Sequence, residues 1–299
     1  MAISNELNTL KANILSAYTM IQNKGGTIPA NKNTQNLSNA INTIQGGGSG
    51  TDYFVDSISS NNYKAIKLIK SIPPITVGNN VTSMQELFSN CSSLNTISLL
   101  DTSKVTNMTG MFRACISLTT VPLLDTSKVT KMQEMFLECS SLTTIPLLDT
   151  SSVTNMQSMF SGCTALTTIP LLDTSSVTNM QEMFKTCTSL TTIPLLDTSS
   201  IINIWRIFNN CSNIENIGGF QNLGNAYSKT ASANTYQYEL SLSKLTKLTH
   251  GSLMNVINNL YDIATKGCKA QKLTLGTDNM AKLTAEEIAI ATNKGWTVS

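Results

Sequence analysis

Six cysteines recur at a fixed interval of 24 residues. They are Cys91, Cys115, Cys139, Cys163, Cys187 and Cys211. Phenylalanine keeps the same period from Phe88 to Phe208, and aspartate keeps it from Asp101 to Asp197. Self-similarity at a period of roughly 20–50 residues predicts a solenoid, because each unit can bury its apolar face only against its neighbours. We therefore expect the central half of the chain to be a rod of stacked units.

The second part of each unit has the apolar spacing of a short helix. In the unit between Cys139 and Cys163, the apolar face consists of Val153, Met156, Met159 and Phe160. Residues three and four apart lie on one side of a helix, so this spacing predicts about two helical turns. Thr154 is followed three residues later by Gln157, and this capping-box pair marks the start of a helix.

The part of the unit after each cysteine predicts a short strand. Its apolar side chains, which we expect to face the core, are Leu142, Ile145 and Leu147. Pro146 is expected at or beside the end of the strand, since proline cannot donate a ladder hydrogen bond. The equivalent prolines are Pro122, Pro170 and Pro194. The fold class expected from these units is α/β, a solenoid of 24-residue strand–helix repeats.

The chain divides into an N-terminal segment, a linker, the solenoid and a C-terminal cap. Residues 1–45 predict a helical hairpin whose first helix carries an a/d seam typical of coiled coils. The seam consists of Leu7, Leu10, Ile14, Ala17 and Ile21. It either packs within the chain or serves for oligomerisation or attachment, because about two heptads are not stable alone in water. Residues 46–52 are a Gly/Ser linker, residues 53–220 the solenoid and residues 221–299 the cap.

The C-terminal region predicts a βαβα cap. Alternating apolar residues indicate strands at 238–242 and 272–275. The segment 252–265 between them has the pattern of an amphipathic helix. Thr284, which is followed by acidic residues, predicts the start of a second helix, because threonine caps helix N-termini and acidic side chains stabilise them.

Composition and charge exclude several classes of protein. Charged residues make up 13% of the chain, about half the usual share of ~25%. The net charge is only +2 and no run of Lys or Arg occurs, so nucleic acid is not an expected partner. No stretch approaches the ~18 apolar residues of a membrane span, and the N-terminus has no signal-peptide pattern. We expect an extracellular or particle surface, kept soluble by Ser, Thr and Asn.

The chemistry-bearing residues predict neither a zinc site nor catalysis. The seven cysteines include no Cys-x-x-Cys pair, and His250 is the only histidine, so no zinc or other cofactor is expected. The cysteine column is expected to be buried free thiols rather than disulfides, since stacked side chains point the same way. The aspartates either cap their own backbone or bind a cation such as calcium. No nucleophile–base–acid set can be assembled, so the chain is not expected to be an enzyme.

The repeat motif V-T-x-M-x-x-M-F-x-x-C-x-x-L-x-x-I, seen from Val153 to Ile169, resembles the BspA-type leucine-rich repeats of bacterial surface proteins. The run from Leu148 to Met156 resembles the related mycoplasma-lipoprotein-type repeat. The resemblance implies a right-handed leucine-rich-repeat solenoid with an adhesive role. Segments 10–29 and 273–296 are similar to parts of tail, structural and leucine-rich-repeat proteins from phages of gut Firmicutes, which implies a virion origin.

The function expected is that of a phage virion structural protein, in the tail or on the head surface. Its solenoid would bind a glycan or protein of the bacterial surface. It would be assembled in the host cytoplasm, act as a homo-oligomer on the virion surface, and be held to other virion proteins through residues 1–45. The alternatives are a bacterial cell-surface adhesin that binds host protein or matrix, and a structural decoration without a ligand.

Candidate contact residues lie on the helical side of the repeats, where the units differ most from one another. They are Arg113, Glu134, Glu182, Lys185, Trp205 and Arg206. Trp205 stands in a column that is otherwise polar, and a Trp–Arg pair is typical of interface anchors. The alternative is that Trp205 packs beneath the C-terminal cap.

Overall fold

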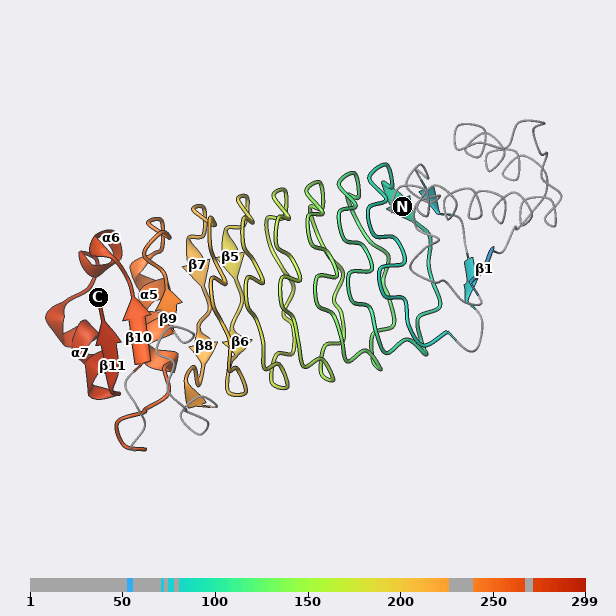
Figure 1. Cartoon of the computed structure of the whole chain (residues 1–299). Helices are drawn as coiled ribbons and strands as arrows, with labels where there is room; N and C mark the ends of the chain where they lie inside the picture. Colours follow the sequence, from blue (N-terminus) through green and yellow to red (C-terminus); the bar gives the residue numbers. More distant parts are fainter. Residues whose placement is uncertain (1–52, 56–70, 73–74, 78–80, 226–238, 267–270) are drawn as a thin grey trace, which may run out of the picture.

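Successive coils of the chain pair with one another at the period of the sequence repeat. Parallel bridges join Ser83, Asn107, Lys131, Asn155, Asn179 and Asn203, each to the next. The computed structural model describes residues 53–55, 71–72, 75–77, 81–225, 239–266 and 271–299. These residues form a rod of stacked coils that ends in a small α/β cap (Figure 1). The expected hairpin of residues 1–45, its seam and the 46–52 linker lie outside the described residues.

The strands of the rod are short and pair in parallel. At the N-terminal end, β1 (Tyr53–Val55) pairs with β3 (Ile75–Val77), and β2 (Ser71–Ile72) pairs with β4 (Thr96–Ile97). In the last two coils, β5 (Thr192–Ile193) pairs with β7 (Asn216–Ile217) and β6 (Leu196–Asp197) with β8 (Phe220–Gln221). Pro194 directly follows β5, so the expectation that proline lies beside the end of a short strand is confirmed there.

The predicted helix in each unit is wrong, because residues 81–220 contain no α-helix. Positive φ angles interrupt the segment at two places in each coil, for example 52° at Ser158 and 77° at Gly162. The backbone N–H groups then alternate between two kinds of partner. Those of Ser158 and Phe160 donate to the next coil, whereas that of Met159 donates three residues back to Met156. A stack of three-residue turns therefore replaces the helix.

The predicted capping box is also absent, because its residues join neighbouring coils instead. The side-chain oxygen of Asn155 accepts the backbone N–H of Gln157 at 2.9 Å. The side-chain oxygen of Gln157 accepts from the Asn179 amide of the next coil at 3.2 Å. The carbonyl of Thr154 accepts the Thr178 hydroxyl at 3.0 Å. Polar residues that resembled a helix start thus tie one coil to the next.

The core of the rod is a stack of phenylalanine rings beside a column of thiols. Neighbouring rings from Phe88 to Phe208 lie 5.5–5.9 Å apart and within 13° of parallel. The six described cysteines are buried and free, which confirms the expected free thiols. Each thiol from Cys115 onward donates to the phenylalanine carbonyl of an earlier coil, as Cys163 does to Phe136 at 3.1 Å. The core therefore runs without interruption along the rod.

A column of buried threonines adds one hydrogen bond between coils. The hydroxyl of Thr150 donates to the Asp173 carbonyl at 2.7 Å, and Thr102, Thr174 and Thr198 make the equivalent bond. The Thr126 hydroxyl, in the same column, is buried without a partner.

Replacing Thr150 by valine should lower the free energy of unfolding by about 1–2 kcal/mol, because the Asp173 carbonyl loses its buried donor. Thr126→Val is the matched control and should change it little, since the hydroxyl it removes makes no bond. Urea unfolding followed by circular dichroism measures both. Equal losses in the two variants would contradict the role of the bond.

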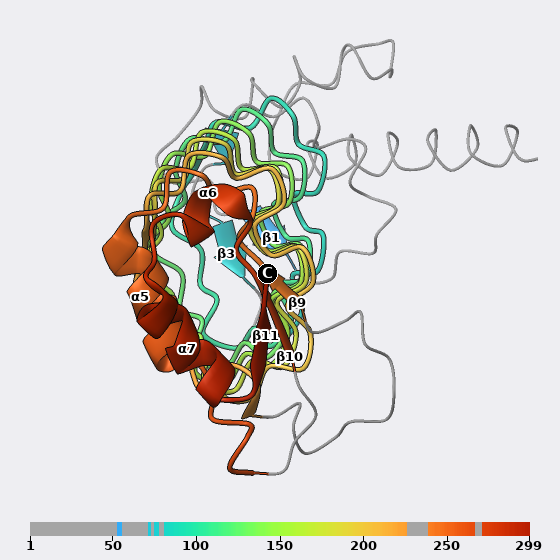
Figure 2. The ribbon, with the colours of Figure 1, turned by 90° about the vertical axis from the view of Figure 1, so that its left-hand side faces the viewer.

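The C-terminal cap continues the stack with a parallel sheet of order β11-β10-β9. The strands are β9 (Glu239–Ser241), β10 (Gln271–Thr274) and β11 (Trp296–Val298). The helices are α5 (His250–Asn259), α6 (Thr277–Met280) and α7 (Ala285–Asn293). Viewed onto the C-terminal end, α5 and α7 lie on one side and the three strands on the other (Figure 2). Helix α5 also contacts β7 and β8, so the cap covers the last coil.

The structure tests two predictions for the helices of the cap, namely where α7 begins and where α5 ends. Thr284 caps α7 with its side chain, and Glu287 completes a capping box, so the expected helix start is confirmed. Helix α5, which the sequence predicted to extend to residue 265, ends at Asn259. Leu260 adopts an extended conformation and bridges Leu223 in parallel, so pairing with the last coil ends the helix early.

Candidate functional site

Each central repeat contains two adjacent leucines, and only the second reaches the core. Leu148 is 2% exposed, whereas Leu147 is 63% exposed. Successive side chains of an extended segment point to opposite sides, so a doublet cannot bury both members. The expectation that Leu147 faces the core is therefore wrong.

The exposed leucines form a continuous row along the rod, which we call the leucine ladder. It consists of Leu99, Leu123, Leu147, Leu171 and Leu195. A single exposed leucine is common on protein surfaces. A contiguous apolar row is not, and such rows mark interaction sites. The leucine ladder is thus the most distinctive surface feature among the described residues.

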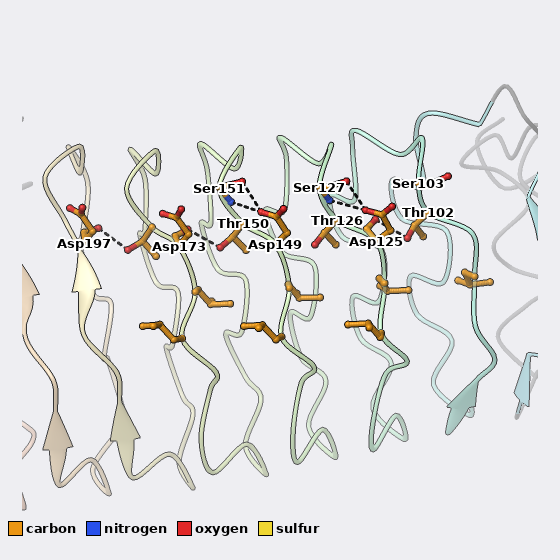
Figure 3. Close-up of a pocket in the computed structure, with 18 of the residues that line it drawn as sticks. Thr102, Ser103, Asp125, Thr126, Ser127, Asp149, Thr150, Ser151, Asp173 and Asp197 are labelled. Carbon is orange, nitrogen blue, oxygen red and sulfur yellow. Dashed lines mark hydrogen bonds between the residues drawn. The ribbon is translucent and has the colours of Figure 1, made fainter.

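A row of carboxylates, the aspartate row, runs beside the leucine ladder. It consists of Asp101, Asp125, Asp149, Asp173 and Asp197. Each aspartate follows its leucine by two residues, which places both on the same side of an extended segment. Figure 3 shows Asp125 to Asp197 on successive coils with their carboxylates pointing the same way.

The aspartates are held by the serine two residues further on. Asp149 accepts the backbone N–H of Ser151 at 3.1 Å and its hydroxyl at 2.7 Å (Figure 3). Asp101, Asp125 and Asp173 make the same pair of bonds. The alternative that these residues cap their own backbone is therefore confirmed. Among the described residues, no cluster of His, Cys, Asp or Glu could hold a metal ion.

The serine bonds also keep these carboxylates ionised. In Asp101, Asp125, Asp149 and Asp173 the pKa is lowered, first by the serine hydroxyl and then by the serine backbone N–H. Lysines reinforce this effect in the first two coils, where Lys104 and Lys128 lower the pKa of Asp101 and Asp125. Serine replaces lysine at 152, 176 and 200, so negative charge is concentrated at the last three carboxylates of the row, Asp149, Asp173 and Asp197.

The leucine ladder and the aspartate row together line one groove of about 1160 Å³. Its lining extends from Leu99 to Gln221 and otherwise consists of buried leucines, threonines and serines. The groove therefore crosses the coils and runs along the axis of the rod. It presents an apolar strip beside an anionic strip, with hydroxyl groups next to both.

None of the six predicted contact residues lines this groove. They form separate contacts elsewhere on the coils. Arg113 pairs with Glu134 of the next coil at 3.1 Å, and Lys185 pairs with Glu182 at 3.1 Å. Surface ion pairs of this kind contribute about 0–1 kcal/mol to stability.

Trp205 and Arg206 form a small exposed patch in the last regular repeat. The Trp205 side chain is 38% exposed, so it is not buried beneath the cap. The guanidinium of Arg206 lies 4.0 Å from the centre of the Trp205 ring, a cation–π contact. The two side chains therefore contact each other, and neither lines the groove.

The part of the chain that the structure describes has no helix that is both long and apolar enough to span a membrane. His250, the only histidine, begins α5 and contacts Glu287 at 2.8 Å. That contact joins α5 to α7 within the cap, far along the chain from the groove.

Comparison with known proteins assigns the repeats to a family. The family described as "Mycoplasma protein of unknown function, DUF285" matches residues 75–166, 119–220 and 141–241. These overlapping matches span more than half of the 299 residues. The chain belongs to the DUF285 family. DUF285 is a BspA-related family, so the repeats of this chain are of that type.

Among solved structures, a leucine-rich repeat protein from Bacteroides ovatus is similar to this DUF285 chain at 17% sequence identity. The match covers 77% of this chain and 66% of that protein, with a TM-score of 0.22. The chain thus spans slightly less than two thirds of the length of that protein. No curated protein matches the chain.

Proposed function

We propose that this DUF285 protein is a non-enzymatic binding protein whose ligand lies in the groove between the leucine ladder and the aspartate row. The observation that carries the proposal is the leucine ladder. The core is already filled by the second leucine of each doublet, such as Leu148, so the fold does not require the first. Apolar surface left in water is unfavourable by ~25 cal/mol per Å². A ligand that covers the ladder recovers this free energy.

The groove suits binding rather than catalysis. General acid catalysis needs a carboxyl group whose pKa is raised toward neutrality. The pKa of four carboxyls in the aspartate row is lowered instead, first of all by their serine hydroxyls. The described residues of the groove include no cysteine, histidine or lysine that could act as nucleophile or base. The groove therefore provides an extended surface for binding a ligand.

The location proposed for the protein is the surface of a phage particle, in the tail or on the head. There the rod would bind a component of the bacterial surface, and residues 1–45 would attach a homo-oligomer to other virion proteins. The support is the resemblance of segment 10–29 to tail and structural proteins, and of segment 273–296 to leucine-rich-repeat proteins, from phages of gut Firmicutes. An antibody against the chain should label particles of the phage whose genome encodes it. Label restricted to the bacterial envelope would instead favour the adhesin alternative.

Binding by the groove is tested with fluorescently labelled full chain and cells of the phage host. The double variant Leu147→Asn/Leu171→Asn should bind at least tenfold more weakly, because two central apolar contacts are lost, each worth about 1–3 kcal/mol. Its fold should persist, since both side chains are exposed. The matched control is Ile116→Asn, which replaces an exposed apolar side chain outside the groove. Equal cell binding by the double variant and the wild-type chain would refute the proposal.

A further inference from the structure

We propose that the occupant of the groove is an amphipathic α-helix of a partner protein, with apolar residues along one side and Lys or Arg beside them. This inference rests on the proposed function and names the class of ligand for the same groove. It follows from the direction of the groove, from its repeat distance and from its charge.

The direction of the groove excludes recognition by strand addition. The groove is lined by equivalent residues of successive coils, from Leu99 to Leu195, so a ligand in it crosses the coils. Figure 3 shows the carboxylates at one level of each coil, in a row that crosses the strands. A peptide strand adds to a sheet only when it runs alongside an edge strand. A peptide along this groove must therefore satisfy its own backbone hydrogen bonds, as an α-helix does.

The repeat distance of the leucine ladder matches the pitch of an α-helix. Paired parallel strands lie about 4.8 Å apart, and the stacked phenylalanine rings lie 5.5–5.9 Å apart. One turn of an α-helix rises about 5.4 Å. A helix along the groove can therefore place one apolar side chain on each coil, from residues spaced three and four apart. Covering five leucines takes roughly 15 residues, because each residue rises about 1.5 Å.

The charge of the groove determines the polar side of this helix. The aspartate row lies on one side of the leucine ladder, two residues along each coil. Lys104 and Lys128 offset the charge in the first two coils, and serines stand at 152 and 176 in the next two. Position 200 is also a serine, so the strongest attraction for cations is at Asp149, Asp173 and Asp197, with the first two at the centre of the groove. A helix with Lys or Arg beside its apolar side would pair with these carboxylates while its apolar side covers the leucines.

The test is binding of a synthetic 18-residue peptide to the full chain, measured by fluorescence anisotropy. The peptide has leucines spaced three and four apart and lysines along one flank. Two control peptides are used: one with every lysine changed to glutamate, and one with the same residues in strict apolar–polar alternation. We expect both controls to bind at least tenfold more weakly, because one reverses the charge and the other loses the helical apolar side.

Variants of the full chain locate the contact. Asp149→Asn/Asp173→Asn should weaken peptide binding at least tenfold at low salt and should reduce its salt dependence. Asparagine keeps the oxygen that accepts the serine N–H, so the turn is retained while the charge is removed. Asp101→Asn/Asp125→Asn is the matched control and should have a smaller effect, since Lys104 and Lys128 already offset those charges.

Several results would overturn the inference. The inference is wrong if the lysine and glutamate peptides bind equally, or if the helical and alternating peptides bind equally. It is also wrong if no peptide binds. A dimer in light scattering that Leu147→Asn/Leu171→Asn converts to a monomer would make a second copy the occupant. If the leucine variants lose cell binding while the peptide does not bind, the groove still binds a ligand and only its helical nature is wrong. If cell binding is also unaffected, both proposals fail.

Discussion

Replacing Phe160 by alanine should lower the free energy of unfolding by about 3–5 kcal/mol, the usual cost of removing a fully buried phenylalanine. The Phe160 side chain is fully buried, and its ring stacks between those of Phe136 and Phe184 at 5.7 and 5.8 Å. A solenoid unit is stable only through its two neighbours. The resulting cavity would therefore weaken the coil of Phe160 and its contacts with the coils on both sides.

Two matched variants separate this effect from a general loss of apolar area. Leu147→Ala removes an exposed leucine and should change stability by less than about 0.5 kcal/mol. Phe88→Ala lies at the end of the described ring stack, with one stacked neighbour, and should cost less than Phe160→Ala. Urea unfolding of the full chain measures all three. A Phe160→Ala variant no less stable than Leu147→Ala would contradict the stacked core.

The columns of the rod could be predicted from the sequence because period alone determines them. Residues 24 positions apart must stack if each coil is one period long, whatever the backbone does within the coil. The free buried thiols and the self-capping aspartates follow from this reasoning and from ordinary side-chain preferences. Both are present in the structure.

The backbone within each coil could not be predicted in the same way. Val153, Met156 and Met159 are three residues apart, and this spacing fits one side of a helix as well as a series of three-residue turns. The deciding fact is that neighbouring coils lie close enough to accept N–H groups, as Gln181 accepts from Ser158 at 2.9 Å. Such partners are 23 residues away, so local propensity contains no signal for them.

The sequence analysis did not predict the groove, although the leucine doublet of each repeat indicates an exposed row of leucines. The doublet Leu147-Leu148 recurs in every central unit within a segment assigned as extended. Alternation in such a segment requires one leucine to face outward. The predicted contact residues, such as Trp205 and Arg206, stand at the most variable positions of the repeat, whereas the groove is lined by the most uniform ones. In a solenoid, repetition can itself form a binding surface, because identical residues line up into continuous rows.

Alkaline pH should unfold the rod, because its core contains thiols whose ionisation is opposed by burial. Burial raises the pKa of Cys163 to about 12 and that of Cys211 to about 11. Burial also raises the pKa of Cys115, Cys139 and Cys187. In the unfolded chain the same thiols ionise at their ordinary pKa of about 8.5. Above that pH the unfolded state binds fewer protons than the folded state.

The sign of the effect follows from this difference in bound protons. Stability contributed by the thiols is fully present below about pH 8.5 and is lost as pH rises toward the folded pKa values. Each thiol can lower the free energy of unfolding by up to about 1.4 kcal/mol per pH unit. Five thiols in one continuous core can together remove several kcal/mol per unit, which is comparable to the total stability of many proteins. We therefore expect unfolding between roughly pH 9 and 11.

The measurement is the urea midpoint of the full chain at several pH values from 7 to 11, with reductant present. The double variant Cys139→Ala/Cys163→Ala is the informative comparison. At pH 7 it should be less stable, because Cys139 and Cys163 lose their bonds to the carbonyls of Phe112 and Phe136. At alkaline pH it should lose stability less steeply, because two of the groups that drive the transition are gone. Other ionising side chains are unchanged between the two proteins, so a pH slope that is the same in both would mean that the buried thiols do not cause alkaline unfolding.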